Sequence, residues 1–152
     1  MIKVKRIDHV AIAVGDRDAA GTRLQALFGL AEEAREHVPG QQVDVLFLGC
    51  EPASAALAAS SLELVAPAGP GGGPGGGNDG LLRFLDKRGP GLHHVCFEVE
   101  DLDEALASLK AAGVPLIDEV PRPGARGHRV AFLHPAATGG VLFELCAAGH
   151  SS

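Results

Sequence analysis

Two histidines and two glutamates occupy matched places in the two halves of this sequence. His9 lies in the stretch RIDHVAIAV, and His94 lies at the same place in GLHHVCFEV, 85 positions later. Each half then ends in a short apolar segment with one acid in its middle, Glu63 in the first half and Glu144 in the second. Imidazole nitrogen and carboxylate oxygen are donors that divalent first-row metals accept. The sequence therefore predicts a metal site shared by two repeats.

Strand alternation places these four residues on a face that carries few bulky side chains. Successive strand residues point to opposite faces, and larger apolar residues such as Ile12, Phe97 and Phe143 fall opposite the histidines and glutamates. Such a sheet can pack helices on its bulky face and leave the ligand face hollow for a small molecule. Either histidine alone is more often structural. A carboxylate within an apolar strand, however, is rarely buried unless it is paired or binds a metal.

Register separates two further histidines from the predicted ligands. His93 is adjacent to His94 and points the other way, so one of the pair is not a ligand, and register with His9 selects His94. His134 closes an apolar segment, and a structural, supporting or substrate-facing role is open for it.

The composition is that of one compact globular domain, or of two half-domains that share a core. The chain has 152 residues, of which 46% are hydrophobic and 21% are charged. A net charge of −6 argues against a nucleic-acid surface. No apolar run is long enough to span a membrane and no secretory signal is visible, so we expect a cytoplasmic protein. We also expect buried free thiols at Cys50, Cys96 and Cys146.

Each half has the pattern of a βαβββ module. In the first half we expect a strand at 4–14, a helix at 16–30 and strands at 31–38, 42–48 and 61–65. In the second half we expect a strand at 92–99, a helix at 101–113 and strands at 115–120, 128–133 and 140–146. The predicted fold is α+β, with paired βαβββ modules that form a curved mixed sheet around a metal-binding cavity.

A glycine- and proline-rich segment separates the two modules. Residues 68–80 suit neither helix nor strand and are expected to be a flexible connector, which a short helix follows at 81–87. The connector lacks the G-K-[ST] signature of a phosphate-binding loop. We therefore divide the chain into a first module at 1–67, a connector with its helix at 68–89, and a second module at 90–152.

Five stretches of the sequence are similar to the methylmalonyl-CoA epimerases, which belong to the vicinal-oxygen-chelate superfamily. They are residues 7–11, 62–67, 91–95, 130–135 and 139–145, and the resemblance covers nearly the whole chain. It implies paired βαβββ modules around a divalent metal, with Co²⁺ or Mn²⁺ favoured and Ni²⁺ or Zn²⁺ as alternatives. It carries the metal ligands over to His9, Glu63, His94 and Glu144.

The resemblance also implies a reaction, the interconversion of (2R)- and (2S)-methylmalonyl-CoA through an enolate. A metal that chelates the substrate stabilises the developing negative charge, and carboxylates move the proton at C2. Glu144 is the candidate for one of these proton transfers besides being a ligand. The implied partners are an acyl-CoA substrate and a second copy of the chain in a homodimer, with no nucleic acid and no membrane.

One basic segment could bind the phosphates of the coenzyme. It contains Arg122, Arg126, His128 and Arg129 and leads towards His134. Arginine side chains pair with phosphates, so Arg126, Arg129 and His134 are candidates for substrate binding. A solvated loop is the alternative interpretation of the same residues.

The sequence departs from part of this family at the position of the facing acid. Val45 aligns where some relatives carry the facing glutamate, and Asp44 lies one residue earlier. A shift of one residue on a strand places a side chain on the other face, so Asp44 could serve only if a bulge re-aims it.

Two other functions are compatible with the same fold. A glyoxalase-type metal-dependent isomerase or lyase can use an identical ligand set, although the flanking motifs favour the epimerase. A metal-free binding protein would sequester its ligand in the cavity, and the presence of all four ligands argues against it. A ring-cleaving dioxygenase needs two histidines and one carboxylate with open positions, which a fourth protein ligand disfavours.

Overall fold

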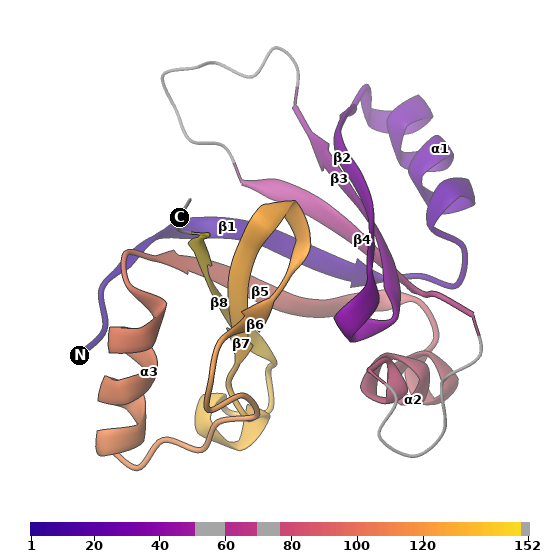
Figure 1. The fold of residues 1–152 in the computed structure, drawn as a ribbon. Helices are drawn as coiled ribbons and strands as arrows, with labels where there is room; N and C mark the ends of the chain where they lie inside the picture. The colour runs from indigo at the N-terminus through magenta and orange to yellow at the C-terminus, as the bar shows by residue number, and fades with distance from the viewer. Residues whose placement is uncertain (51–59, 70–76, 150–152) are drawn as a thin grey trace. The chain divides into compact units, whose positions relative to one another are not determined.

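The computed structural model describes residues 1–50, 60–69 and 77–149. Within them, three α-helices and eight β-strands follow one another as two βαβββ modules (Figure 1). The first module contains β1 (Val4–Ala13), α1 (Arg17–Phe28), β2 (Ala31–Val38), β3 (Val43–Gly49) and β4 (Ser61–Pro67), and α2 (Asp79–Arg88) follows it. The second contains β5 (Gly91–Val99), α3 (Leu102–Ala111), β6 (Arg122–Pro123), β7 (His128–Phe132) and β8 (Phe143–Ala148). Short 3₁₀ helices are η1 (Pro39–Gln41), η2 (Ala125–Gly127) and η3 (Pro135–Thr138).

The strands are hydrogen-bonded in the order β2-β3-β4-β1-β5-β8-β7-β6. Strand β5 pairs with β8 in parallel, whereas β2 with β3, β3 with β4, β6 with β7 and β7 with β8 pair antiparallel. The sheet is therefore mixed. The predicted α+β fold with two βαβββ modules is confirmed.

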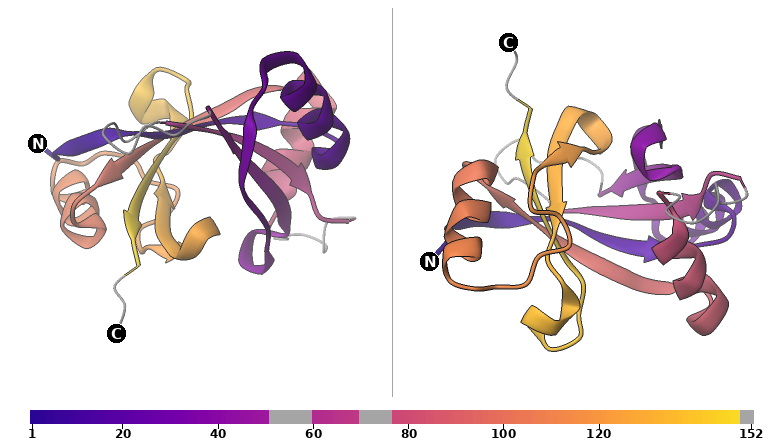
Figure 2. Two further views of the ribbon diagram at one scale, coloured as in Figure 1. Left: turned by 90° about the horizontal axis from the view of Figure 1, so that it is seen from above. Right: turned by 60° about the horizontal axis from the view of Figure 1, so that its bottom comes forward.

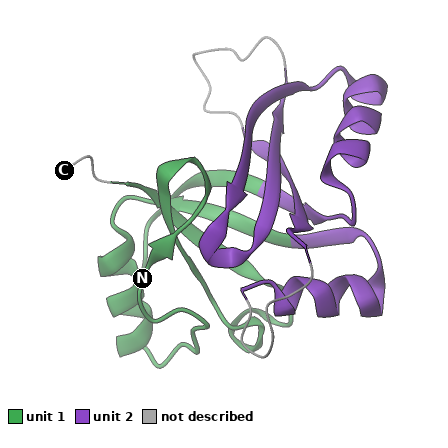
Figure 3. Cartoon of the chain, turned by 45° about the vertical axis from the view of Figure 1, so that its right-hand side comes forward, with its two compact units in different colours: residues 1–9, 94–152 green, residues 10–93 purple. Residues whose placement is uncertain are grey.

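The chain divides into two compact units (Figure 3). One unit comprises Val10–His93, and the other joins Met1–His9 to His94–Ser152. The divisions fall inside β1 and β5, so each of these strands contributes to both units. The module boundaries expected from the sequence, at 1–67, 68–89 and 90–152, stay a prediction.

In the unit of residues 10–93, α1 packs against β3 and β4. Its N-terminus is capped by Asp16, whose carboxylate accepts hydrogen bonds from two backbone N–H groups at 3.0 Å. Leu24 packs on the core that contains Leu46 and Leu64. Gly21 lets the helix approach the sheet closely. A Cβ at this position would lie 2.5 Å from Leu46 Cδ2.

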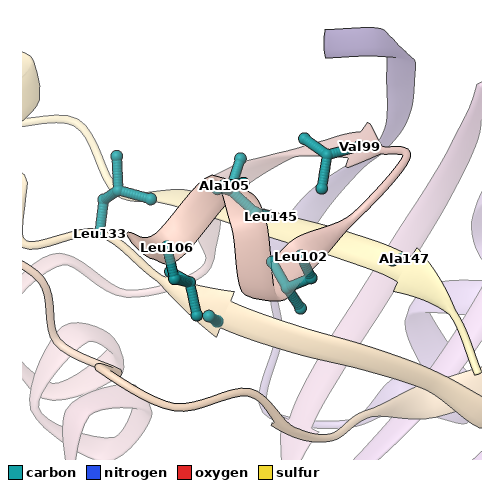
Figure 4. Packing of buried hydrophobic residues seen from close by; sticks show 8 residues of the cluster. Val99, Leu102, Ala105, Leu106, Leu133, Leu145 and Ala147 are labelled. Atoms are coloured by element: carbon teal, nitrogen blue, oxygen red, sulfur yellow. The ribbon is translucent and has the colours of Figure 1, made fainter. Parts of the chain in front are cut away.

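In the other unit, α3 packs against β7 and β8, and the views in Figure 2 show this helix from two directions. Asp101 caps α3 by accepting a hydrogen bond from Glu104 N–H at 2.9 Å. Leu102 and Leu106 of α3 pack on Leu145 of β8 in the cluster drawn in Figure 4. The bulky face of this part of the sheet is thus covered by its helix, as strand alternation predicted.

Two expectations from the sequence are wrong. The strand expected at 115–120 is only an isolated bridge between Leu116 and Leu133, and β6 is confined to Arg122–Pro123. Cys50 is exposed, whereas Cys96 and Cys146 are buried free thiols as expected.

The expected connector falls partly on 70–76, which lies outside the described residues. Among the described residues, no helix is both long and apolar enough to cross a membrane.

Candidate metal centre

Three of the predicted ligands meet within the unit of residues 1–9 and 94–152. His9 on β1, His94 on β5 and Glu144 on β8 are all buried, with exposed fractions of 3%, 7% and 5%. The Nε2 atoms of His9 and His94 are 3.3 Å apart. Glu144 Oε1 lies 3.3 Å from His9 Nε2 and 3.7 Å from His94 Nε2. Their donor atoms therefore converge on one point.

Strand pairing explains why His94 and Glu144 share a face. In the parallel pairing of β5 with β8, Glu144 is opposite Cys96, which lies two residues after His94 on the same side of the strand. In the antiparallel pairing of β7 with β8, Phe132 is opposite Glu144. The His94 ring meets Phe132 edge to face, with ring centroids 5.1 Å apart. The opposite face carries Leu145 and packs on α3.

This cluster fits a divalent cation by its donor chemistry. Two imidazoles and a carboxylate, all with ligand atoms within 4.8 Å of one another, suit borderline metals such as Zn²⁺, Co²⁺ and Ni²⁺. All three side chains are buried, and a buried carboxylate needs such partners. His9, His94 and Glu144 could therefore bind a metal ion.

The electrostatics of Glu144 favour its charged form. Burial alone would raise the pKa of this carboxyl, but hydrogen bonds from His9 and His94 and the attraction of both rings outweigh it. The pKa of Glu144 consequently lies below its ordinary value. An ionised Glu144 can bind a cation.

A buried carboxylate that the sequence patterns did not single out, that of Asp8, contacts the Nδ1 side of the His9 ring. Asp8 is fully buried, and its Oδ2 lies 2.7 Å from His9 Nδ1. Arg6 donates to Asp8 Oδ1 at 2.8 Å, and Arg126 donates to Oδ2. Burial alone would raise the pKa of Asp8, but the bond from His9 and the charge of Arg126 hold it at about 2. Strand neighbours point to opposite faces, so alternation predicts no such contact.

The fourth predicted ligand, Glu63, belongs to the other compact unit. It lies on β4 opposite Phe47 of β3 and is 6% exposed. A carboxylate so deeply buried needs a charged or hydrogen-bonded partner. This is the same argument by which the sequence analysis selected Glu63. Its place as a metal ligand stays a prediction.

Val45 and Asp44 lie on opposite faces of β3. The register of β3 with β4 is regular, with Val45 opposite Val65 and Phe47 opposite Glu63, so Val45 shares the face of Glu63. The one irregularity between β2 and β3 lies at Glu32 and Ala34 on β2. Asp44 Oδ1 lies 2.9 Å from His37 Nδ1. Strand alternation therefore holds at Asp44, and no bulge turns it towards the face of Glu63.

The other predicted site residues have contacts of their own. His93 packs edge to face on Phe84 of α2, with centroids 5.0 Å apart. His134 caps η3 by accepting a hydrogen bond from Ala136 N–H at 3.1 Å. Arg129 donates twice to Asp103, at 2.6 and 3.0 Å. The substrate-binding roles expected for Arg126, Arg129 and His134 stay predictions.

The fold and this cluster define a class of protein. Residues 8–132 match the Glyoxalase/Bleomycin resistance protein/Dioxygenase superfamily, and the chain belongs to that superfamily. It is 36% identical over 144 residues to an ethylmalonyl-CoA/methylmalonyl-CoA epimerase of Cereibacter sphaeroides, covering 93% of this chain and 97% of the relative. It is also 36% identical over 143 residues to the uncharacterized protein YqjC of Bacillus subtilis, covering 94% and 92%.

A solved structure agrees with these relatives. A variant of the Streptomyces coelicolor methylmalonyl-CoA epimerase, in complex with 2-nitronate-propionyl-CoA, superposes with a TM-score of 0.83 at 32% sequence identity. The superposition covers 97% of both chains. The similarity to this epimerase therefore extends over nearly the whole fold.

Proposed function

We propose that this protein is a metal-dependent epimerase that interconverts the (2R) and (2S) forms of methylmalonyl-CoA. The observation that carries the proposal is the buried convergence of His9, His94 and Glu144. Its support is the near full-length similarity to proteins named as methylmalonyl-CoA epimerases. The proposed set of metal ligands is these three residues together with Glu63.

The chain's own residues account for binding and proton transfer. A divalent cation in this site would supply a Lewis acid for the negative charge that develops on the substrate oxygen. Glu144 is ionised and can accept the C2 proton, and its burial keeps water from competing for that role. Val45 occupies the position of the expected second acid, so the opposite face of C2 must be reprotonated by water or by another group.

The proposal includes the way in which the acyl-CoA is held. Arg126, Arg129 and His134 are the candidates for substrate binding, and arginines suit the phosphates of the coenzyme. We further propose a cytoplasmic homodimer. The buried free thiols Cys96 and Cys146 suit a reducing compartment.

Proton exchange at C2 tests the proposal directly. The Co²⁺-loaded protein is incubated with (2R)-methylmalonyl-CoA in deuterium oxide, and NMR follows the C2 proton and the methyl signal. We expect rapid deuterium incorporation that a chelator abolishes and metal restores, above the rate without protein. Ethylmalonyl-CoA, measured in parallel, defines the acyl range.

Two further measurements separate the competing functions. A glyoxalase-type isomerase would leave methylmalonyl-CoA unchanged and convert the hemithioacetal of methylglyoxal and glutathione. A metal-free binding protein would bind acyl-CoA, as seen by calorimetry, without exchange at C2. Either outcome would overturn the proposed epimerase.

A further inference from the structure

Asp8 is a fully buried aspartate that contacts three basic side chains. Its Oδ1 accepts from Arg6 at 2.8 Å, and its Oδ2 accepts from Arg126 and faces His9 Nδ1 at 2.7 Å. Arg6 is itself held by Glu98, whose Oε2 accepts from Arg6 Nε at 2.6 Å. Both carboxylate oxygens of Asp8 are therefore engaged, and two arginines compensate its buried charge.

The contact between Asp8 and His9 decides which nitrogen of His9 carries the proton. An ionised carboxylate can only accept hydrogen bonds. The nitrogen at 2.7 Å from Asp8 must therefore be a donor, Nδ1–H. Without a metal, Nε2 can donate to Glu144, whereas a metal ligand needs the lone pair of Nε2, which the neutral Nδ1–H tautomer provides. Nε2 is the atom that lies 3.3 Å from both His94 Nε2 and Glu144 Oε1, so the lone pair faces the candidate metal centre.

Arg126 reaches Asp8 through an unusual backbone conformation. It lies in η2 with φ of 57°, in the left-handed region that residues other than glycine seldom adopt. This region is unfavourable for a residue other than glycine, so the surroundings of Arg126 must compensate for it. One interaction that compensates for it is the ion pair with Asp8, 118 residues away in sequence.

We propose that Asp8 is a positioning residue of the metal centre, which fixes the Nδ1–H tautomer and ring orientation of His9 and is itself held in place by hydrogen bonds from Arg6 and Arg126. The inference rests on the proposed function, because it concerns the affinity of the same site for its metal. Carboxylates placed behind a metal-binding histidine typically contribute about 10- to 100-fold to metal affinity. Asp8 touches neither substrate nor metal in this assignment.

The test compares Asp8→Asn with Asp103→Asn in the full-length protein. Asp103 is also an aspartate paired with an arginine, Arg129, in the same unit, but its carboxylate is exposed. Asparagine at position 8 offers one oxygen where three donors converge, and its NH₂ group would favour the opposite tautomer of His9. We expect Co²⁺ to bind about 10- to 100-fold more weakly to Asp8→Asn and unchanged to Asp103→Asn. The visible absorption bands of bound Co²⁺ should change only in Asp8→Asn.

A metal-free measurement separates this inference from the proposed function. Long-range ¹H–¹⁵N NMR spectra of the histidine rings report the tautomer of His9, and we expect Nδ1–H in the unsubstituted protein. Equal Co²⁺ affinity and equal absorption bands in Asp8→Asn would overturn the inference. So would an Nε2–H tautomer in the unsubstituted protein, even if Asp8→Asn does not fold. If the unsubstituted protein binds no Co²⁺, the proposed function fails, and the tautomer alone then decides the role of Asp8.

Discussion

His9 and His94 stand at the same place in two repeats, yet the structure supports them in different ways. The residue before His9 is Asp8, which is buried and bonded to the imidazole behind the ligand atom. The residue before His94 is His93, which packs on Phe84. His94 meets the ring of Phe132 edge to face. The repeat thus preserves the two histidines, whereas the residues around each of them differ.

The difference between ionic and aromatic support has measurable consequences. A carboxylate fixes a tautomer and adds charge, so its removal changes both the protonation and the basicity of the ring. An aromatic edge-to-face contact supplies only about 0.5–1.5 kcal/mol of orientation and packing. Loss of the contact between Asp8 and His9 should therefore have a larger effect than loss of the contact between Phe132 and His94.

The largest effect is expected at the group that both histidines share. Glu144 Oε1 lies within 3.7 Å of both Nε2 atoms, so Glu144→Gln removes a ligand charge and the proposed base together. We expect C2 exchange to fall by at least about 10²–10⁴-fold for both epimers, measured by NMR in deuterium oxide. Glu119→Gln, which alters an exposed partner of Lys110, is the control. Exchange within tenfold of the unsubstituted rate in Glu144→Gln would exclude Glu144 as the base.

The two arginines of the basic segment should separate substrate binding from support of His9. Arg129 pairs with Asp103, and Arg126 pairs with Asp8. If both bind the coenzyme, Ala at either position should raise KM more than it lowers kcat, by roughly fivefold for about 1 kcal/mol. Only Arg126→Ala should also weaken Co²⁺ binding. An unchanged KM in both variants would make this a solvated segment.

A smaller loss of Co²⁺ affinity is expected when the aromatic contact of His94 is removed. Phe132→Leu keeps an apolar side chain but removes the ring whose centroid lies 5.1 Å from that of His94. The loss of an aromatic contact of this kind predicts about 2- to 10-fold weaker Co²⁺ binding, measured by competition with a chelator. A loss as large as that of Asp8→Asn would erase the proposed distinction between ionic and aromatic support.

Glu98, which binds Arg6 in the network around Asp8, should affect how the free energy of unfolding depends on pH. Burial alone would raise the pKa of Glu98, but hydrogen bonds from Lys5 and Arg6 hold it below its ordinary value of 4.5. A carboxyl with a depressed pKa stabilises the fold above its ordinary pKa, and this contribution is lost as the pH falls below it. Urea unfolding of Glu98→Gln should therefore show about 1 kcal/mol less stability at pH 7, and the difference should shrink towards pH 3. A difference independent of pH would assign the effect to packing.

The sequence predicted that His9, His94 and Glu144 lie together because two simple regularities hold for them. The internal repeat aligns His9 with His94, and strand alternation puts Glu144 on the face of His94, as the pairing of β5 with β8 confirms. Both regularities are local or periodic. Neither needs knowledge of how distant side chains meet.

The features that the sequence did not predict depend on contacts that neither the repeat nor strand alternation describes. Asp8 and His9 are neighbours that alternation separates, and Arg126 reaches Asp8 from 118 residues away. The strand expected at 115–120 is absent because Ile117 and Asp118 both donate to the carbonyl of Phe132. The carboxylate of Asp118 accepts from the N–H of Phe132 in turn, so a side chain replaces the regular ladder. A buried charge such as Asp8 could have been noticed from Arg6, two residues before it.

Asp44 provides the weakest expected effect and a contrast with Asp8. Each aspartate is one residue away from a position of interest, Asp8 beside His9 and Asp44 beside Val45. Asp8 reaches its neighbour, whereas Asp44 pairs with His37 on the face opposite Glu63, with no bulge in the pairing of β3 with β4. Asp44→Asn should therefore leave C2 exchange within about twofold, whereas loss of a general acid or base would cost about 10²–10⁴-fold. A large loss with unchanged metal content would mean that Asp44 supplies the second proton, and that its side chain reaches the face of Glu63.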